Sequence, residues 1–328
     1  MKVCVIGCGK MGAVHAENVA QHSSLILHSV VDPNLGLAQQ LASRFGVVAA
    51  SNAEEALKSS DVDAVIIASS SDTHATLIEQ AARRGKAILC EKPIGTNMEE
   101  IQHVAQVIKE TGVPFMLGFN RRFDPRFSAV HSSLSAGKIG APEMVCITSR
   151  DALPPPLGYV KVSGGIFRDM TIHDFDMARW MLGEAPSEVF ATGSCLVNQD
   201  FATVGDSDTA MVVLKTPSGR LCQINNSRRS TVGYDQRVEV FGSQGVLKSE
   251  DVPAHVNMGG MKARPGDHFC HIYNRYQQSY QAELDHFVAC VENASRPLVG
   301  IEDGILALKI ANAAQQSKEE GRPVAIAY

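Results

Sequence analysis

Residues 1–12 read MKVCVIGCGKMG, an apolar strand-like run followed at once by glycines at positions 7, 9 and 12. A G-x-G-x-x-G between a strand and a helix is typical of dinucleotide-binding folds. The first glycine permits a tight turn, the second lets the backbone approach a pyrophosphate, and the third lets the helix pack on the strand. The N–H groups that open the helix attract phosphate. The segment therefore predicts cofactor contacts at Gly7, Gly9, Lys10, Met11 and Gly12.

An acidic residue completes this pattern. Asp32 follows the apolar stretch 25–31 and lies 20 residues after Gly12. A carboxylate there accepts both hydroxyls of an adenosine ribose and repels a 2′-phosphate. Because neither of the next two residues is an arginine, we expect NAD rather than NADP. Ser69 and His74, after the next apolar stretch, join the predicted cofactor set, and a purely structural role is equally open for His74.

Strand-like and helical patterns alternate through the first 119 residues. Helical patterns at 73–84 and 98–110 separate apolar stretches at 3–6, 25–31, 64–68, 87–90 and 115–117. Continuous apolar strands joined by helices predict a parallel sheet that is buried on both faces. We therefore expect an α/β fold with a doubly wound Rossmann domain over residues 1–119.

Residues 120–328 show a different order of strand-like and helical patterns. Strands are expected at 143–149, 188–197, 209–215, 221–226, 236–241 and 246–249, and helices at 125–136, 165–182, 274–292 and 301–316. The short turns 217–219 and 242–245 indicate hairpins, and 251–267 is expected to be a loop. This pattern predicts a C-terminal α+β domain with a mostly antiparallel sheet over residues 120–328.

Composition excludes several classes of protein. The 328 residues suit about two domains, and 30 basic against 35 acidic side chains leave no basic face for nucleic acid. The apolar runs are too short to span a membrane. The eight dispersed cysteines and a chain that begins with a strand predict a reduced, cytoplasmic protein. The tightest possible metal cluster, Asp267, His268, Cys270 and His271, lacks a second ligand pair, so no metal is expected.

Two clusters carry the chemistry. Lys92, in Glu91-Lys92-Pro93, follows a strand at the edge where open α/β sheets bind ligands, and Pro93 restricts it to an extended conformation. Asp169 and His173 stand four residues apart in a predicted helix, so they share one face.

An imidazole held by a carboxylate is the usual general base near neutral pH, and a lysine beside a hydroxyl stabilises the developing oxyanion. Together these groups suit the oxidation of a secondary alcohol. For Lys92 a solvated side chain remains an alternative. For Asp169 and His173 a helix-stabilising ion pair, or a metal site with Asp176, also remains open.

The three motifs in this order resemble the glucose–fructose oxidoreductase/inositol dehydrogenase (Gfo/Idh/MocA) family along the whole chain. They are G-x-G-x-x-G with His15 three residues later, Glu91-Lys92-Pro93, and the Asp169–His173 pair. Stretches 163–169 and 233–242 most resemble its inositol dehydrogenases. The resemblance implies NAD-dependent oxidation of a cyclic polyol, most like myo-inositol, in a homodimer or homotetramer that forms through the open face of the C-terminal sheet.

The resemblance also implies roles for individual residues. Lys92, Asp169 and His173 would be catalytic, with His173 as the proton acceptor, and Glu91 and Lys92 would join the cofactor set. The polyol pocket would be lined by the catalytic residues and by Asn120, Arg121, Asp151, Tyr234 and Tyr280. A scyllo-inositol or aldose dehydrogenase, a dehydratase or glycosidase with transient redox chemistry, and a non-catalytic NAD sensor remain alternatives.

Overall fold

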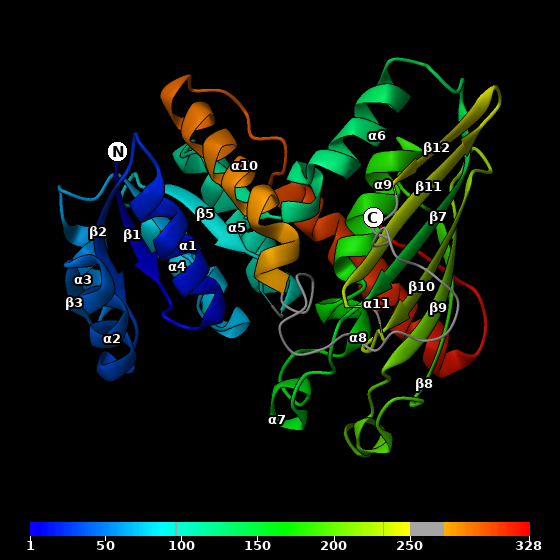
Figure 1. Cartoon of the computed structure of the whole chain (residues 1–328), viewed down its shortest axis with the longest axis horizontal. Helices are drawn as coiled ribbons and strands as arrows, with labels where there is room; N and C mark the ends of the chain where they lie inside the picture. Colours follow the sequence, from blue (N-terminus) through cyan, green and yellow to red (C-terminus); the bar gives the residue numbers. More distant parts are fainter. Residues whose placement is uncertain (96, 232, 250–271) are drawn as a thin grey trace. The chain divides into compact units, whose positions relative to one another are not determined.

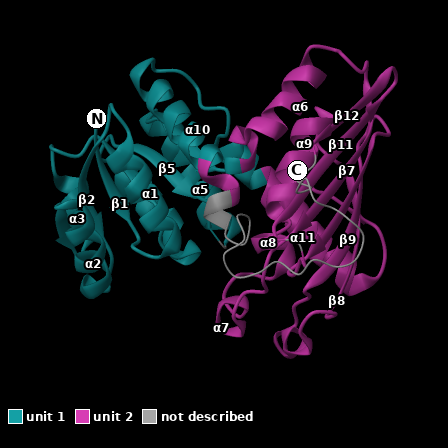
Figure 2. Cartoon of the chain, viewed as in Figure 1, with its two compact units in different colours: residues 1–120, 278–305 teal, residues 121–277, 306–328 magenta. Residues whose placement is uncertain are grey.

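The computed structural model describes residues 1–95, 97–231, 233–249 and 272–328. The expected loop at 251–267 and the cluster at 267–271 lie outside these residues. The chain forms two compact units, coloured separately in Figure 2. Unit 1 comprises residues 1–120 and 278–305, and unit 2 comprises 121–277 and 306–328. No described helix is both long enough and apolar enough to cross a membrane.

Unit 1 is built on a six-stranded parallel sheet in the order β3-β2-β1-β4-β5-β6 (Figure 1). Its strands are β1 Lys2–Ile6, β2 Ile26–Val31, β3 Val48–Ala50, β4 Ala64–Ile67, β5 Ala87–Glu91 and β6 Phe115–Gly118. Its connecting helices are α1 Lys10–Gln21, α2 Leu35–Phe45, α3 Ala53–Lys58, α4 His74–Ala82 and α5 Met98–Thr111. All residues of β4, β5 and β6 are buried. The predicted doubly wound sheet is confirmed.

Short polar residues determine where these helices begin. The side chains of Asn34, Asn52 and Asn97 accept hydrogen bonds from the first N–H groups of α2, α3 and α5. Gly46 and Gly112 end α2 and α5 in the left-handed region, which glycine adopts without steric cost. Local sequence therefore sets the boundaries of these helices.

A later part of the chain returns to unit 1. It contains most of α10 (Ile272–Glu292) and the start of α11 (Ile301–Glu320). The N–H of Leu117 donates to the carbonyl of Val299 at 3.2 Å. A Cβ on Gly304 would lie 2.4 Å from a side-chain carbon of Ile94, so α11 packs closely against the segment after β5. The return of residues 278–305 is a long-range feature that a linear division at residue 119 does not include.

Unit 2 contains a seven-stranded sheet in the order β12-β11-β7-β10-β9-β8-β13. Its strands are β7 Pro142–Arg150, β8 Glu188–Ser194, β9 Thr209–Lys215, β10 Leu221–Ser227, β11 Asp235–Gly242, β12 Gly245–Ser249 and β13 Val324–Ala325. Neighbouring strands are antiparallel except for β7 and β10, which are parallel. The predicted α+β domain with a mostly antiparallel sheet is therefore confirmed.

Helices α6 and α9 of unit 2 pack against its sheet. The helices of this unit are α6 Pro125–Ser135, α7 Leu157–Val160, α8 Ile166–Asp169 and α9 Ile172–Leu182, together with most of α11. Helix α9 contacts β7 and β10, and α6 contacts β12 (Figure 1). The opposite face exposes a cross-strand row of apolar side chains, Val246, Phe241, Met144 and Leu221.

Two expected elements are wrong in detail. The helix predicted over 165–182 is divided into α8 and α9, because the hydroxyl of Thr171 bonds backward to the carbonyl of Ile166 and outward to Asn226. The strand predicted over 188–197 ends at Ser194. The N–H groups of the three residues 196–198 donate instead to the carboxylate of Asp208, at 2.7 to 2.8 Å.

Candidate functional site

The turn between β1 and α1 has the backbone geometry of a phosphate-binding loop. Gly7 has a φ of 99°, a conformation that favours glycine. A Cβ on Gly12 would lie 1.8 Å from the carbonyl oxygen of Gly7, so the helix approaches the strand as closely as the motif requires. Gly9 precedes α1 and has no side chain to cap its first N–H groups. These N–H groups can therefore bind a phosphate.

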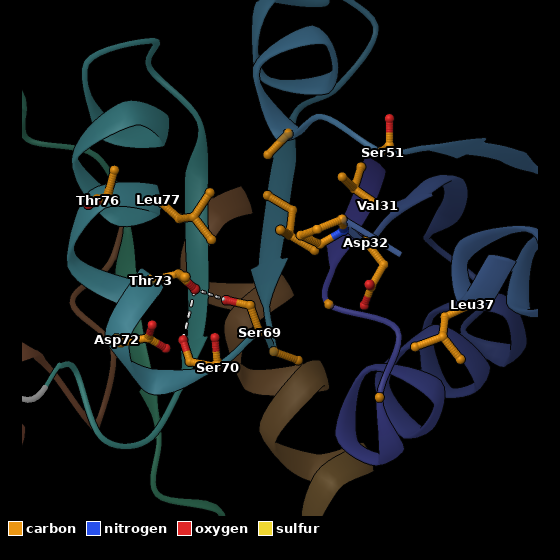
Figure 3. Close-up of a pocket in the computed structure, with 16 residues that line it drawn as sticks. Val31, Asp32, Leu37, Ser51, Ser69, Ser70, Asp72, Thr73, Thr76 and Leu77 are labelled. Carbon is orange, nitrogen blue, oxygen red and sulfur yellow. Dashed lines mark hydrogen bonds between the residues drawn. The ribbon is translucent and has the colours of Figure 1, made fainter. Parts of the chain in front are cut away.

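Asp32 stands at the end of β2 beside this turn (Figure 3). One carboxylate oxygen accepts from the N–H of Cys8 at 2.9 Å and the other from the N–H of Asn34 at 2.8 Å. These bonds hold the carboxylate at the rim of a cavity of about 690 Å³. The cavity is lined by Gly7, Gly9, Asp32 and Ser69 of the predicted cofactor set, and by Leu37, Thr73 and Leu77.

The remaining predicted cofactor residues have other environments. Lys10 is exposed, and Met11 and Lys92 are half-buried. His74 is buried, with one ring nitrogen 2.7 Å from the carbonyl oxygen of Pro93 and the other 3.1 Å from that of Ser69. Burial lowers the pKa of His74. The imidazole therefore links the segments that follow β4 and β5, which is the structural role that the sequence left open.

A second buried polar cluster in unit 1 surrounds Glu91, next to Lys92. The carboxylate of Glu91 lies 2.8 Å from Nε2 of His15, and the ring of Tyr280 meets His15 edge-on at 5.8 Å. Asn120 is buried, and its Nδ2 has no partner among the described residues. The structure thus places three of the predicted substrate-binding residues, Lys92, Asn120 and Tyr280, in unit 1.

The Asp169–His173 motif spans the break between two helices. Asp169 is the last residue of α8 and His173 the second of α9, so the predicted spacing along one continuous helix is wrong. One oxygen of Asp169 accepts from the hydroxyl of Tyr159 at 2.7 Å. The other accepts from the guanidinium of Arg228 at 3.1 Å. Two donors from outside the motif therefore fix this carboxylate.

Several acids and phenols gather around Asp169. Burial raises the pKa of Tyr234, and so do the charges of Asp151 and Asp169. Burial and the same two carboxylates also raise the pKa of Tyr159. The hydroxyl of Tyr276 is buried and has no partner among the described residues. Such a group of hydroxyls and carboxylates offers donors and acceptors to a ligand rich in hydroxyls.

Sequence reasoning missed Tyr159, Tyr276 and Arg228. Tyr276 recurs at helical spacing with apolar residues of the segment 274–292, and Arg228 stands beside Arg229, so neither position is distinguished by the sequence. The signal that could have indicated Tyr276 is its hydroxyl, because a phenol in an apolar stripe still needs a hydrogen-bond partner.

Arg121, a predicted substrate residue, is buried in an ion pair with Asp174. Its guanidinium also donates to the hydroxyl of Ser149 at 3.0 Å, and the amide of Asn226 donates to Asp174 at 2.8 Å. Asn226 in turn accepts from Thr171 at 2.7 Å, just before α9. These contacts anchor the helix that carries His173.

No metal site is found in the part of the chain that the structure describes, because no three histidine, cysteine, aspartate or glutamate side chains there are placed to hold an ion.

The glycine turn, the carboxylate at the end of β2 and the second, mixed sheet define an NAD-binding oxidoreductase of two units. Residues 1–119 match the oxidoreductase family with an NAD-binding Rossmann fold, and residues 131–326 match the C-terminal alpha/beta domain of the same family. The chain belongs to the Gfo/Idh/MocA oxidoreductases, as its sequence predicts.

Relatives match the chain over nearly its full length. An inositol 2-dehydrogenase of Rhizobium meliloti (strain 1021) is 44% identical, with 98% of both chains covered. A myo-inositol 2-dehydrogenase of Thermotoga maritima is 42% identical, covering 99% of this chain and 98% of the relative. The solved scyllo-inositol dehydrogenase of Lactobacillus casei, with bound NAD(H) and scyllo-inositol, superposes with a TM-score of 0.91. It shares 28% identity and covers 100% of this chain and 99% of that one.

Proposed function

We propose that this protein oxidises one secondary hydroxyl of myo-inositol to a ketone, giving 2-keto-myo-inositol, with transfer of a hydride to NAD. The observation that carries the proposal is full-length identity of 44% and 42% to two inositol 2-dehydrogenases. The acids and phenols around Asp169 support it, since a cyclic polyol presents many hydroxyls to be bound.

The roles of the residues follow from their chemistry. When bound, NAD supplies the acceptor for the hydride that leaves the alcohol carbon. We assign His173 as the acceptor of the hydroxyl proton, which leaves a carbonyl on the substrate. The ammonium of Lys92 would hold the oxygen and stabilise the negative charge that develops on it. Asp169, Asp151 and Tyr234 would orient the neighbouring hydroxyls of the ring.

The second candidate is a scyllo-inositol dehydrogenase. The solved Lactobacillus casei enzyme of that name has the same fold at a TM-score of 0.91. The two substrates differ only in the configuration of one hydroxyl. The same proton acceptor and lysine therefore serve both candidates, and substrate preference separates them.

The test is the absorbance of reduced nicotinamide with NAD or NADP and a panel of myo-inositol, scyllo-inositol and glucose. We expect turnover of myo-inositol with NAD. Preferred turnover of scyllo-inositol would select the second candidate, and binding of NAD without turnover of any substrate would favour a sensor. His173→Ala should lower kcat by roughly 10² to 10⁴.

The cofactor assignment has its own variant. Asp32→Ala should weaken the binding of NAD and reduce the discrimination against NADP, because the carboxylate that repels a 2′-phosphate is removed. The measurement is titration with NADH and with NADPH, followed by the fluorescence of the reduced nicotinamide. An unchanged preference for NAD would contradict the role given to Asp32.

We also propose a homo-oligomer that forms through the exposed face of the unit 2 sheet. Phe241, Met144 and Leu221 are 46%, 41% and 43% exposed and are cross-strand neighbours. A contiguous apolar patch of this kind is typical of an interface between subunits. Sedimentation should show a dimer or tetramer that Phe241→Asp dissociates, while a monomeric wild type would exclude it.

A further inference from the structure

Asp169 accepts hydrogen bonds from two groups of very different exposure. The guanidinium of Arg228 donates to Oδ2, and the side chain of Arg228 is only 1% exposed. The hydroxyl of Tyr159, a residue that is 47% exposed, donates to Oδ1. One carboxylate oxygen is therefore held from the interior and the other from the side of the solvent.

Arg228 is itself held in place. Its N–H donates to the carbonyl of Asp208 at 2.8 Å, and its guanidinium lies 6.0 Å from the centre of the Phe201 ring. A second nitrogen lies 3.5 Å from the carboxylate of Asp206. The arginine is thus placed between two carboxylates, and its planar fork has little freedom to turn away from Asp169.

Asp206 connects the arginine to the helix that carries Asp169. Its Oδ1 accepts the N–H of Ile166, the first residue of α8, at 2.8 Å. Gly165 precedes that helix with a φ of 87°, and a Cβ there would lie 3.1 Å from Asp206. Asp206 therefore fixes the start of α8, while Arg228 fixes the carboxylate at its end.

We propose that Arg228 is a positioning residue that holds Asp169 ionised and in a single orientation, with Tyr159 as the exchangeable second donor. On the function proposed above, Asp169 then serves as a fixed hydrogen-bond acceptor for the substrate, and the proton goes to His173. The oxygen that Tyr159 occupies is the one presented to a ring hydroxyl. Arg228 acts only through Asp169.

The charged surroundings of Asp169 agree with this role. Its surroundings include Arg228 and, beyond that, Asp206, with the phenols of Tyr159 and Tyr234 and the carboxylate of Asp151, whose charge acts on both phenols. Arg228 supplies a positive charge in direct contact with Asp169. Burial and the charge of Asp169 raise the pKa of Tyr159, so the phenol remains a donor throughout the working range of pH. Loss of Arg228 would remove a cation that lies 3.1 Å from the carboxylate of Asp169, which favours the protonated form of Asp169.

The test compares Arg228→Met, Arg228→Lys and Tyr159→Phe with the wild type, and uses the exposed neighbour Arg229→Met as the matched control. Arg228→Met should lower kcat on myo-inositol by roughly 10² and move the acid limb of the pH profile to higher pH. Arg228→Lys should recover part of the activity because it restores the charge. Tyr159→Phe should mainly lower KM, because no phenol then competes with the ring hydroxyl for that oxygen, and Arg229→Met should change neither parameter.

A structural role alone gives a different result. If Arg228 only stabilised the fold, Arg228→Met and Arg228→Lys would reduce the melting temperature and the active fraction. The active enzyme would then keep the pH profile and KM of the wild type, and that outcome would overturn the proposal. If Arg228→Met does not fold, the pH profile of Arg228→Lys and the KM of Tyr159→Phe decide.

A second measurement does not depend on turnover. The carboxyl ¹³C resonance of Asp169, assigned with Asp169→Asn, can be titrated in the full-length protein. We expect it to remain ionised to lower pH in the wild type than in Arg228→Met. Equal titration curves would overturn the positioning role. A wild type that oxidises no inositol but shows this difference would overturn the proposed function alone.

Discussion

Two buried acids, one in each unit, are neutralised in different ways. In unit 2, Asp174 is fully buried against Arg121 and also accepts from Asn226 at 2.8 Å. In unit 1, Glu283 is equally buried, but neither of its oxygens has a partner among the described residues. Burial raises the pKa of Glu283 well above its usual range, and the nearby charge of Glu91 adds to this shift.

The two sites show different ways of reducing the free-energy cost of burying a carboxyl group. Burial also raises the pKa of Asp174, but the charge of Arg121 and the hydrogen bond from Asn226 act against that shift. Asp174 is thus balanced by a cation, whereas Glu283 is balanced by keeping its own proton. The first arrangement fixes geometry around α9, and the second leaves a neutral acid beside the Glu91–His15 pair.

The largest expected effect comes from breaking the ion pair. Arg121→Met leaves Asp174 as an uncompensated buried charge, and we expect the free energy of unfolding to fall by about 3–5 kcal/mol. Urea unfolding of the variant and the wild type measures this loss. The control is the double variant Arg121→Met/Asp174→Leu, which removes both charges and should recover much of the stability. If the double variant were as unstable as the single one, packing and not charge would explain the loss.

Asp208 is expected to show a stability effect of intermediate size, because backbone N–H groups hold its carboxylate. Asp208 accepts three backbone N–H groups from residues 196–198. Burial raises the pKa of Asp208, but these bonds outweigh it and hold the pKa below its usual 3.8. Its contribution to stability is therefore present above pH 3.8 and is lost as the pH falls through the folded-state value.

Asp208→Asn should lower the free energy of unfolding at neutral pH by about 1–3 kcal/mol, because an amide cannot accept all three bonds as a carboxylate does. The difference from the wild type should shrink in acid. Thermal unfolding at several pH values measures it. Asp200→Asn, an exposed change in the same segment, should have little effect. A loss that stayed constant into acid would assign the effect to packing.

The sequence predicted the geometry of the glycine turn well because the required residues lie within one short β1–α1–β2 unit. Gly7 and Gly12 belong to its turn and helix and Asp32 follows its second strand, so their spacing largely determines how they meet. The same local signals predicted most strands of both sheets.

Long-range contacts account for what the sequence did not predict. The break between α8 and α9 depends on Thr171 and Asn226, which are 55 residues apart. The hydrogen bond that holds the carboxylate of Asp169 comes from Arg228, which is 59 residues away. No local pattern marks such partners, because tertiary packing brings them together.

The smallest expected change is an increase in the free energy of unfolding. Glu283→Gln should raise the free energy of unfolding at neutral pH by about 1 kcal/mol, since the gain from avoiding proton uptake is partly offset by burying an unpaired amide. The folded-state pKa of Glu283 is raised, so stability is highest below its usual 4.5 and falls as the pH rises toward the folded-state value. The slope approaches about 1.4 kcal/mol per pH unit.

The measurement is urea unfolding of both proteins from mildly acidic to mildly alkaline pH, with the exposed Glu292→Gln at the end of α10 as the control. We expect the stability gap between Glu283→Gln and the wild type to widen with pH, while the control follows the wild type. A gap that did not change with pH would mean that Glu283 is ionised in the folded protein. A partner for that charge would then have to neutralise it in unit 1, as Arg121 does for Asp174 in unit 2.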